Sequence, residues 1–97
     1  MNTSLALPTI HLNGTGPDTL MDSYDTASLA LSDAALALRR VELNARDYYV
    51  QGPDAFRRAQ EEHAARLDRL DAIRAEIIAI TEHIDATRPP RRTATPV

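Results

Sequence analysis

The segment Arg46-Asp47-Tyr48-Tyr49 has the residue types best suited to binding a ligand. Arginine offers a flat fork of N–H donors that fits a phosphate, and tyrosine offers a ring for stacking and a hydroxyl for a hydrogen bond. The chain has three tyrosines and one phenylalanine, and two of these aromatic residues are adjacent here. The pattern predicts a nucleotide platform formed by Arg46, Tyr48 and Tyr49. In the alternative interpretation, the tyrosines close the end of the core while Arg46 and Asp47 pair on the surface.

The segment from His11 to Gly16, HLNGTG, is a second candidate. Its glycines expose backbone N–H groups just before an expected helix start, where an anion can bind. The side chains of His11, Asn13 and Thr15 could add hydrogen bonds to the same ligand. The segment is not a Walker motif, because the chain contains no lysine. In the alternative interpretation, Asn13-Gly14 forms a turn and Thr15 caps the helix that follows.

His63 interrupts an otherwise apolar line of residues and has two interpretations. It is either a core histidine bonded to a carbonyl or carboxylate, or a ligand contact near the Arg46–Tyr49 segment. His63 and His83 point to different sides of a helix at about 100° per residue, so they cannot share a metal ion. The chain has no cysteine, and no His, Asp or Glu set has ligand spacing, so we expect no metal and no cofactor.

The sequence contains no catalytic constellation. Asp18, Asp22 and Asp25 follow one side of an expected helix, which suits acid–base chemistry but is better explained by a solvated face. No nucleophile motif surrounds a serine or histidine, and the absence of lysine excludes Schiff-base chemistry. We therefore expect a protein that is not an enzyme.

Two long helices must position these residues. The expected fold is all-α, an antiparallel two-helix hairpin with an extended N-terminal arm. Pro8 and Asn13-Gly14 oppose a helix in the arm, and the Gly-Pro-Asp sequences at 16–18 and 52–54 are typical of helix starts. The single domain, 1–86, is expected to divide into an arm (1–16), a helix (17–43), a loop (44–52) and a helix (53–86), followed by a disordered basic tail (87–97).

The apolar periodicity of both helices follows the heptad type. The first stripe consists of Leu20, Tyr24, Ala27, Leu31, Ala34, Leu38 and Val41, and the second of Phe56, His63, Leu67, Leu70, Ile73, Ile77, Ile80 and Ile84. The alanines at 27, 34 and 35 allow the two helices to approach closely. Glu62 and Arg66 form a favourable pair four residues apart, worth ~0.2–0.5 kcal/mol.

Several apolar residues fall outside these stripes, namely Leu29, Leu36, Leu43 and Ile78. A lone hairpin cannot bury them, so we expect a homo-oligomer in which hairpins form a helical bundle. The alternative is a monomer whose arm covers the second seam. Roughly 40 Å separates the arm from the loop of one chain, so a combined site would join the arm of one protomer to the loop of its neighbour.

Charge and hydropathy exclude several classes of partner. The net charge of −3 averages an acidic body with a tail containing Arg88, Arg91 and Arg92, so no specific nucleic-acid binding is expected. No apolar run is long enough to span a membrane, and no secretory signal is evident. A cytoplasmic protein is therefore expected.

The motifs HLNGT, RDYY-x-QG and AxxEH, the last ending at His63, resemble a group of small helical proteins encoded in bacteriophage genomes. The resemblance covers roughly residues 5–85. Phage proteins of this size include anti-CBASS and anti-Thoeris sponges, which sequester immune signalling nucleotides. This likeness is one of class and assigns no binding residue.

The resemblance implies a non-enzymatic protein that sequesters a cyclic oligonucleotide or a cyclic ADP-ribose type nucleotide between protomers. Arg46, Tyr48, Tyr49 and His63 of one chain would act with His11, Asn13 and Thr15 of another. The alternative is a structural or adaptor protein, in the virion or bound to a host protein, that acts through protein–protein contacts.

Overall fold

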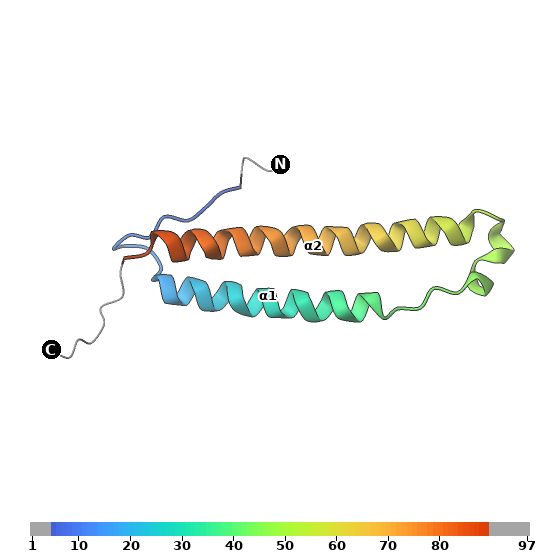
Figure 1. The fold of residues 1–97 in the computed structure, drawn as a ribbon, viewed down its shortest axis with the longest axis horizontal. Coiled ribbons are helices and arrows are strands. Elements are labelled where there is room, and N and C mark those ends of the chain that lie inside the picture. Colours follow the sequence, from blue (N-terminus) through green and yellow to red (C-terminus); the bar gives the residue numbers. More distant parts are fainter. Residues whose placement is uncertain (1–4, 90–97) are drawn as a thin grey trace.

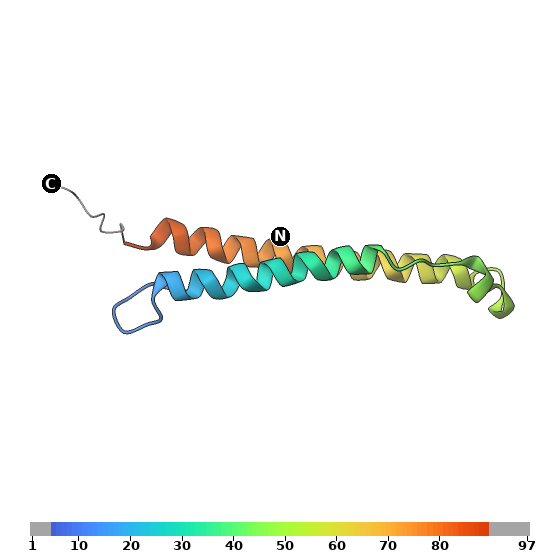
Figure 2. The same cartoon turned by 90° about the horizontal axis from the view of Figure 1, so that it is seen from below.

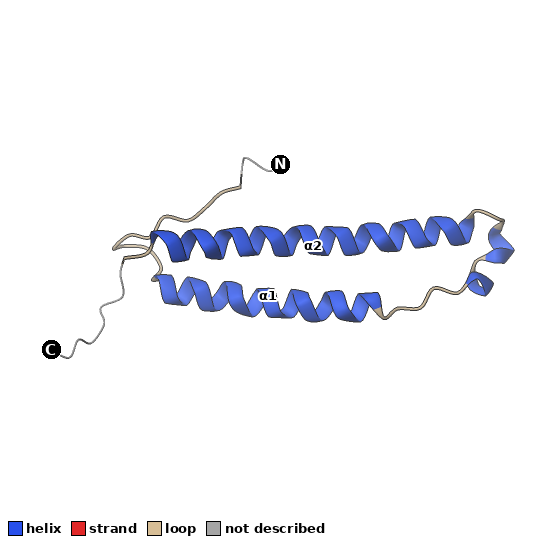
Figure 3. Cartoon of the chain, in the orientation of Figure 1, coloured by secondary structure: helices blue, strands red, loops and turns tan. Residues whose placement is uncertain are grey.

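The computed structural model describes residues 5–89, and two long helices dominate this part of the chain (Figure 1). Helix α1 is Pro17–Arg39 and helix α2 is Ala55–Thr87. Two short 3-10 turns, η1 (Ala45–Asp47) and η2 (Tyr49–Gln51), lie in the connection. Residues 5–89 contain no strand (Figure 3), so the expectation of an all-α chain with two long helices is confirmed.

The two helices lie side by side and run in opposite directions in both views (Figures 1 and 2). Polar side chains join them near the middle. Arg74 Nη2 donates to Ser32 Oγ at 3.3 Å, and Arg39 Nη2 lies 3.6 Å from Asp71 Oδ2. The arm lies at one end of the pair, called here the arm end, and the connection lies at the other, called the loop end.

Helix α1 begins at Pro17 because proline needs no partner for an N–H and its fixed φ suits the first helical position. Gly16 is the N-cap, with extended backbone and no side-chain cap bond. The expectation that Thr15 caps the helix is therefore wrong. Proline at the first helical position places the cap at residue 16, where glycine has no side chain to accept a hydrogen bond.

Helix α1 ends at Arg39, whereas its apolar periodicity predicts helix to residue 43. The N–H of Arg40 is shared between the carbonyls of Leu36 and Ala37, both at 3.2 Å, and residues 41–44 have no regular structure. An extended residue covers ~3.3 Å against 1.5 Å in a helix. Helix α1 is about 35 Å long and α2 about 50 Å. The extended residues after α1 cover the remaining length of α2.

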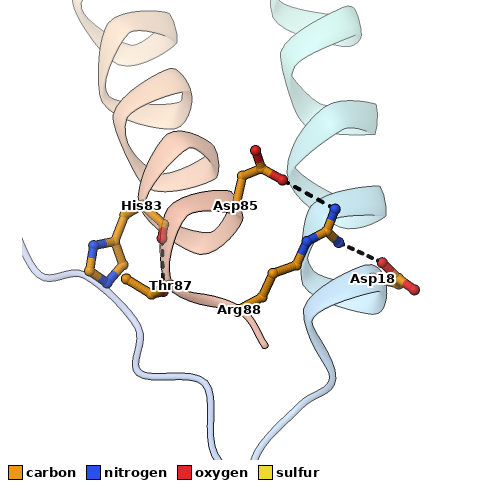
Figure 4. A network of polar contacts seen from close by, with 5 residues as sticks. All are labelled: Asp18, His83, Asp85, Thr87 and Arg88. Carbon is orange, nitrogen blue, oxygen red and sulfur yellow. Dashed lines mark hydrogen bonds and ion pairs between the residues drawn. The ribbon is translucent and has the colours of Figure 1, made fainter. Parts of the chain in front are cut away.

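Helix α2 extends beyond its predicted end. Thr87, expected at the start of a disordered tail, is its last residue, and its Oγ1 donates to the carbonyl of His83 at 2.8 Å. Arg88 is also fixed, and its guanidinium bridges Asp18 at 2.7 Å and Asp85 at 3.1 Å (Figure 4). The rest of the expected tail, residues 90–97, lies outside the described residues. At its start, α2 begins at Ala55 rather than at residue 53.

The arm folds back over the C-terminal part of α2 (Figure 1). His83 Nε2 donates to the carbonyl of Pro8 at 3.0 Å, which ties the arm to the helix. Ile84, the next residue, is completely buried and is the largest side chain with full burial among residues 5–89.

The core is thin. Among residues 5–89 only Ala35 and Ile84 are buried. Ala35 is buried in place of Ala34, which is exposed, as is Val41. The other residues of the predicted stripe are half-buried, namely Leu20, Tyr24, Ala27, Leu31 and Leu38. The radius of gyration is 20.4 Å, against about 12–13 Å for a compact domain of this length.

Large apolar side chains remain in contact with solvent. Leu29 is 70% exposed, Leu36 49% and Ile78 45%, as expected for residues outside the stripes. Ile73 was expected on the second stripe but is 45% exposed. Contiguous exposed apolar surface marks an interaction site, whereas single exposed apolar side chains are common on any protein.

Candidate ligand site at the loop end

The connection between the helices turns twice before α2 begins. The N–H of Tyr48 donates to the carbonyl of Ala45 at 3.0 Å, and that of Gln51 donates to the carbonyl of Tyr48 at 2.9 Å. Gly52 then adopts a φ of 119°, a conformation that side chains with a Cβ rarely adopt. These turns return the chain toward the start of α2 and hold Tyr48 against it.

The two tyrosines of the connection have different surroundings. The ring of Tyr48 packs against Phe56, with centroids 6.1 Å apart and planes tilted by 41°, and Tyr48 is half-buried. Tyr49 is 68% exposed. Tyr48 therefore serves in part to close the end of the core, as the alternative interpretation holds, whereas Tyr49 does not.

A small open hollow lies beside Tyr48. Its volume is about 110 Å³, and its lining consists of Tyr48, Gln51, Ala55, Arg58, Ala59 and Glu62. Ligand pockets for small molecules usually measure ~300–1,000 Å³. The hollow of one chain can therefore receive only part of a nucleotide.

Arg58 and Glu62 give the hollow one charge of each sign, and neither is among the predicted site residues. Arg58 Nη2 lies 3.9 Å from Glu62 Oε2, and both side chains are more than half exposed, so the pair is loose and hydrated. Their spacing of four residues, which puts them on one helix face beside Ala55, is the signal in the sequence that could have identified them.

Arg46 lies in η1, exposed, and does not line the hollow. The expected surface pair between Arg46 and Asp47 is not formed in the described chain. The structure thus brings Tyr48, of the predicted residues, to the hollow, and leaves Arg46 and Tyr49 outside it.

His63 is half-buried on α2, but it does not line the hollow. Within residues 5–89 it makes no hydrogen bond, so the core interpretation, with a carbonyl or carboxylate partner, is wrong for this part of the chain. The favourable pair between Glu62 and Arg66 is confirmed at 3.9 Å.

The arm residues His11, Asn13 and Thr15 are exposed at the arm end, away from the connection (Figure 1). The expected turn is present, since the N–H of Gly14 donates to the carbonyl of His11 at 3.1 Å. One chain therefore does not bring the arm residues to the hollow, in agreement with the distance estimated from helix length.

Residues 5–89 contain neither a candidate metal site nor a membrane-spanning helix. No group of three or more His, Asp or Glu side chains there could hold a metal ion. None of the helices in that range combines the length and apolar character needed to cross a membrane. The acids of α1 at 22 and 25 are exposed, as expected for a solvated face.

Comparison with known proteins gives this chain no relative. No protein-family model, no curated protein and no solved structure matches it.

Proposed function

We propose that this protein is a non-enzymatic binding protein that sequesters a small nucleotide at its loop end. The observation that supports this most is the hollow beside Tyr48. An aromatic ring, a guanidinium and a carboxylate meet there, next to the segment whose residue types suit a nucleotide. The phage resemblance adds the biological setting, namely capture of an immune signalling nucleotide in the cytoplasm of an infected bacterium.

Each lining residue has a role suited to its chemistry. Tyr48, held by Phe56, stacks on the base, because a ring that is already ordered loses little entropy on binding. Arg58 pairs with a phosphate as a fork of donors, and Glu62 accepts hydrogen bonds from ribose hydroxyls. Arg46 and Tyr49, both exposed in the same connection, contact the part of the ligand that extends beyond the hollow.

A second protomer covers the rest of the ligand. The hairpins pair into a helical bundle, and His11, Asn13 and Thr15 of a neighbouring chain supply hydrogen bonds from its arm. His63, one turn beyond Ala59, lies next to the lining residues on the same helix. This arrangement accounts for the small volume of the hollow in one chain.

A structural or adaptor protein is the second candidate. The observation in its favour is the exposed apolar surface of Leu29, Leu36 and Ile78, which is typical of protein–protein contact. Such a protein would use the same bundle without binding a nucleotide.

A thermal-shift screen separates the two candidates. The probes are cyclic dinucleotides, cyclic trinucleotides and cyclic ADP-ribose isomers. At about 100 times its dissociation constant a ligand adds ~2.7 kcal/mol, which for a chain of this size raises Tm by ~10 °C or more. Arg58→Ala and Tyr48→Ala should abolish the shift, whereas Arg69→Ala, an exposed arginine outside the hollow, should retain it.

The chemical state of the bound nucleotide tests the absence of catalysis. Denaturing the complex should release the nucleotide unchanged after prolonged incubation. A released product of different mass would contradict sequestration. No shift with any probe would refute nucleotide capture and favour the adaptor.

A further inference from the structure

An exposed stripe on α1 has a symmetric order of residue types. Leu29 and Leu36, 70% and 49% exposed, are seven residues apart and so face nearly the same direction. Asp25 lies one turn before Leu29, and Arg40 lies one turn after Leu36. Both charged side chains are exposed. The stripe therefore has an acid at one end, a base at the other and two leucines between them, and the polar pair Ser32-Asp33 lies at its midpoint.

The charges at the ends of the stripe have no ion-pair partner among residues 5–89. Neither Asp25 nor Arg40 makes an ion pair among residues 5–89, whereas the neighbouring Arg39 pairs with Asp71. Arg40 keeps helical backbone angles as the C-cap of α1, so it continues the face of the helix. The stripe thus offers both a partly apolar surface and two charges of opposite sign that lack partners in the described chain.

An antiparallel copy of α1 complements this stripe. If Leu36 of the partner subunit lies opposite Leu29, then Arg40 of the partner subunit lies opposite Asp25, because both pairs are symmetric about the point between residues 32 and 33. The two-fold axis repeats each contact, as in any isologous interface. A parallel copy would instead place like charges opposite each other.

We propose that two copies of this chain pair through the Asp25–Leu29–Leu36–Arg40 stripe, antiparallel and with a two-fold axis between residues 32 and 33. The occupant of the exposed face of α1 is therefore α1 of a second copy. The leucines bury apolar surface on either side of the axis, and the two ion pairs fix the register and the direction.

This pairing completes the ligand site, a consequence that depends on the proposed function. Gly16 lies ~25 Å from the axis at 1.5 Å per helical residue. Arg40 of the partner subunit lies ~11 Å from the axis on the same side, and five residues at ~3.3 Å bring the partner's Ala45 to about the same level, ~28 Å from the axis. The arm of each chain then lies level with the loop end of the other.

Charge reversal tests the interface by analytical ultracentrifugation over a range of concentrations. Asp25→Arg alone, and Arg40→Asp alone, each create two like-charge contacts, so each should raise the dimer dissociation constant at least ~10-fold. An equimolar mixture of the two variants should recover association as a heterodimer. A chain with both substitutions should recover the homodimer.

Asp68→Arg and Arg69→Asp are matched controls, since both residues are exposed on α2 and make no ion pair in the described chain. They should associate like the unaltered chain, and circular dichroism should show equal helix content in all variants. A wild-type chain that is monomeric at all concentrations overturns the proposal. So does a mixture of the single variants that stays dissociated.

The interface and the proposed function can fail separately. A dimer that binds none of the nucleotide probes supports the interface and refutes nucleotide capture. A monomer that binds a probe at its own loop end does the reverse.

Discussion

Replacing Ile84 with alanine should be the most damaging single truncation among the residues that the structure describes. Ile84 is fully buried, where the arm returns over α2 and His83 binds Pro8. The substitution removes three carbon groups at ~0.8 kcal/mol each and leaves a cavity, giving a total of ~3 kcal/mol within the range for such truncations. Since small domains have only ~5–15 kcal/mol of stability, this is a large share.

Thermal unfolding followed by circular dichroism measures the effect at one fixed protein concentration. A loss of ~3 kcal/mol should lower Tm by ~12 °C or more in a domain of this length. Ile78→Ala is the matched control, because Ile78 is on the same helix but 45% exposed, and it should cost less than half as much. Equal losses for the two variants would refute the conclusion that the burial of Ile84 stabilises the chain.

Three further changes have defined outcomes. Gly52→Ala should destabilise the chain by ~1–3 kcal/mol, because the φ of 119° at this position is strained for alanine. Gly14→Ala is the control and should be nearly neutral, because the added Cβ would meet only the movable His11 ring, at 2.9 Å from Nε2. Urea unfolding compares the two variants, and equal losses of stability would contradict the strain argument. His83→Ala removes the hydrogen bond to Pro8 and should free the arm, so limited proteolysis should cut residues 5–16 faster. The free energy of unfolding should fall by less than ~1.5 kcal/mol. Unchanged cleavage would show that this hydrogen bond does not hold the arm. Arg88→Ala should lower the free energy of unfolding by no more than ~1 kcal/mol, because the acidic partners of Arg88 are largely exposed. Added salt should reduce this loss by screening the charges, and a loss independent of salt would contradict an ionic contact.

The helices were predictable because their periodicity extends over many turns, but the end of α1 was not. Val41 continues the apolar repeat, and no glycine or proline marks a stop after Arg39. The end of α1 is therefore not encoded in its apolar repeat, and the residues 41–44 that follow it have no regular structure. The burial of Ala35 was not predictable either, since which of two adjacent alanines is buried depends on how α1 packs against α2.

The location of the candidate site was predictable from its tyrosines, but most of the residues that line it were not. The adjacent tyrosines indicated the loop end, and Tyr48 lines the hollow there. Arg58 and Glu62 were missed because their nearness to Tyr48 depends on two 3-10 turns and on Gly52, which return the connection toward α2. Neither turn has a distinctive short motif.

The placement of the arm and the connection at opposite ends of two long helices has a consequence for complementation (Figure 1). In the proposed antiparallel pair, each ligand site takes its arm from one chain and its loop end from the other. A chain with a defective arm and a chain with a defective loop end would then form a mixed dimer with one intact site and one doubly defective site. Random mixing of two inactive proteins should therefore restore about a quarter of the binding capacity, with the affinity of the unaltered protein.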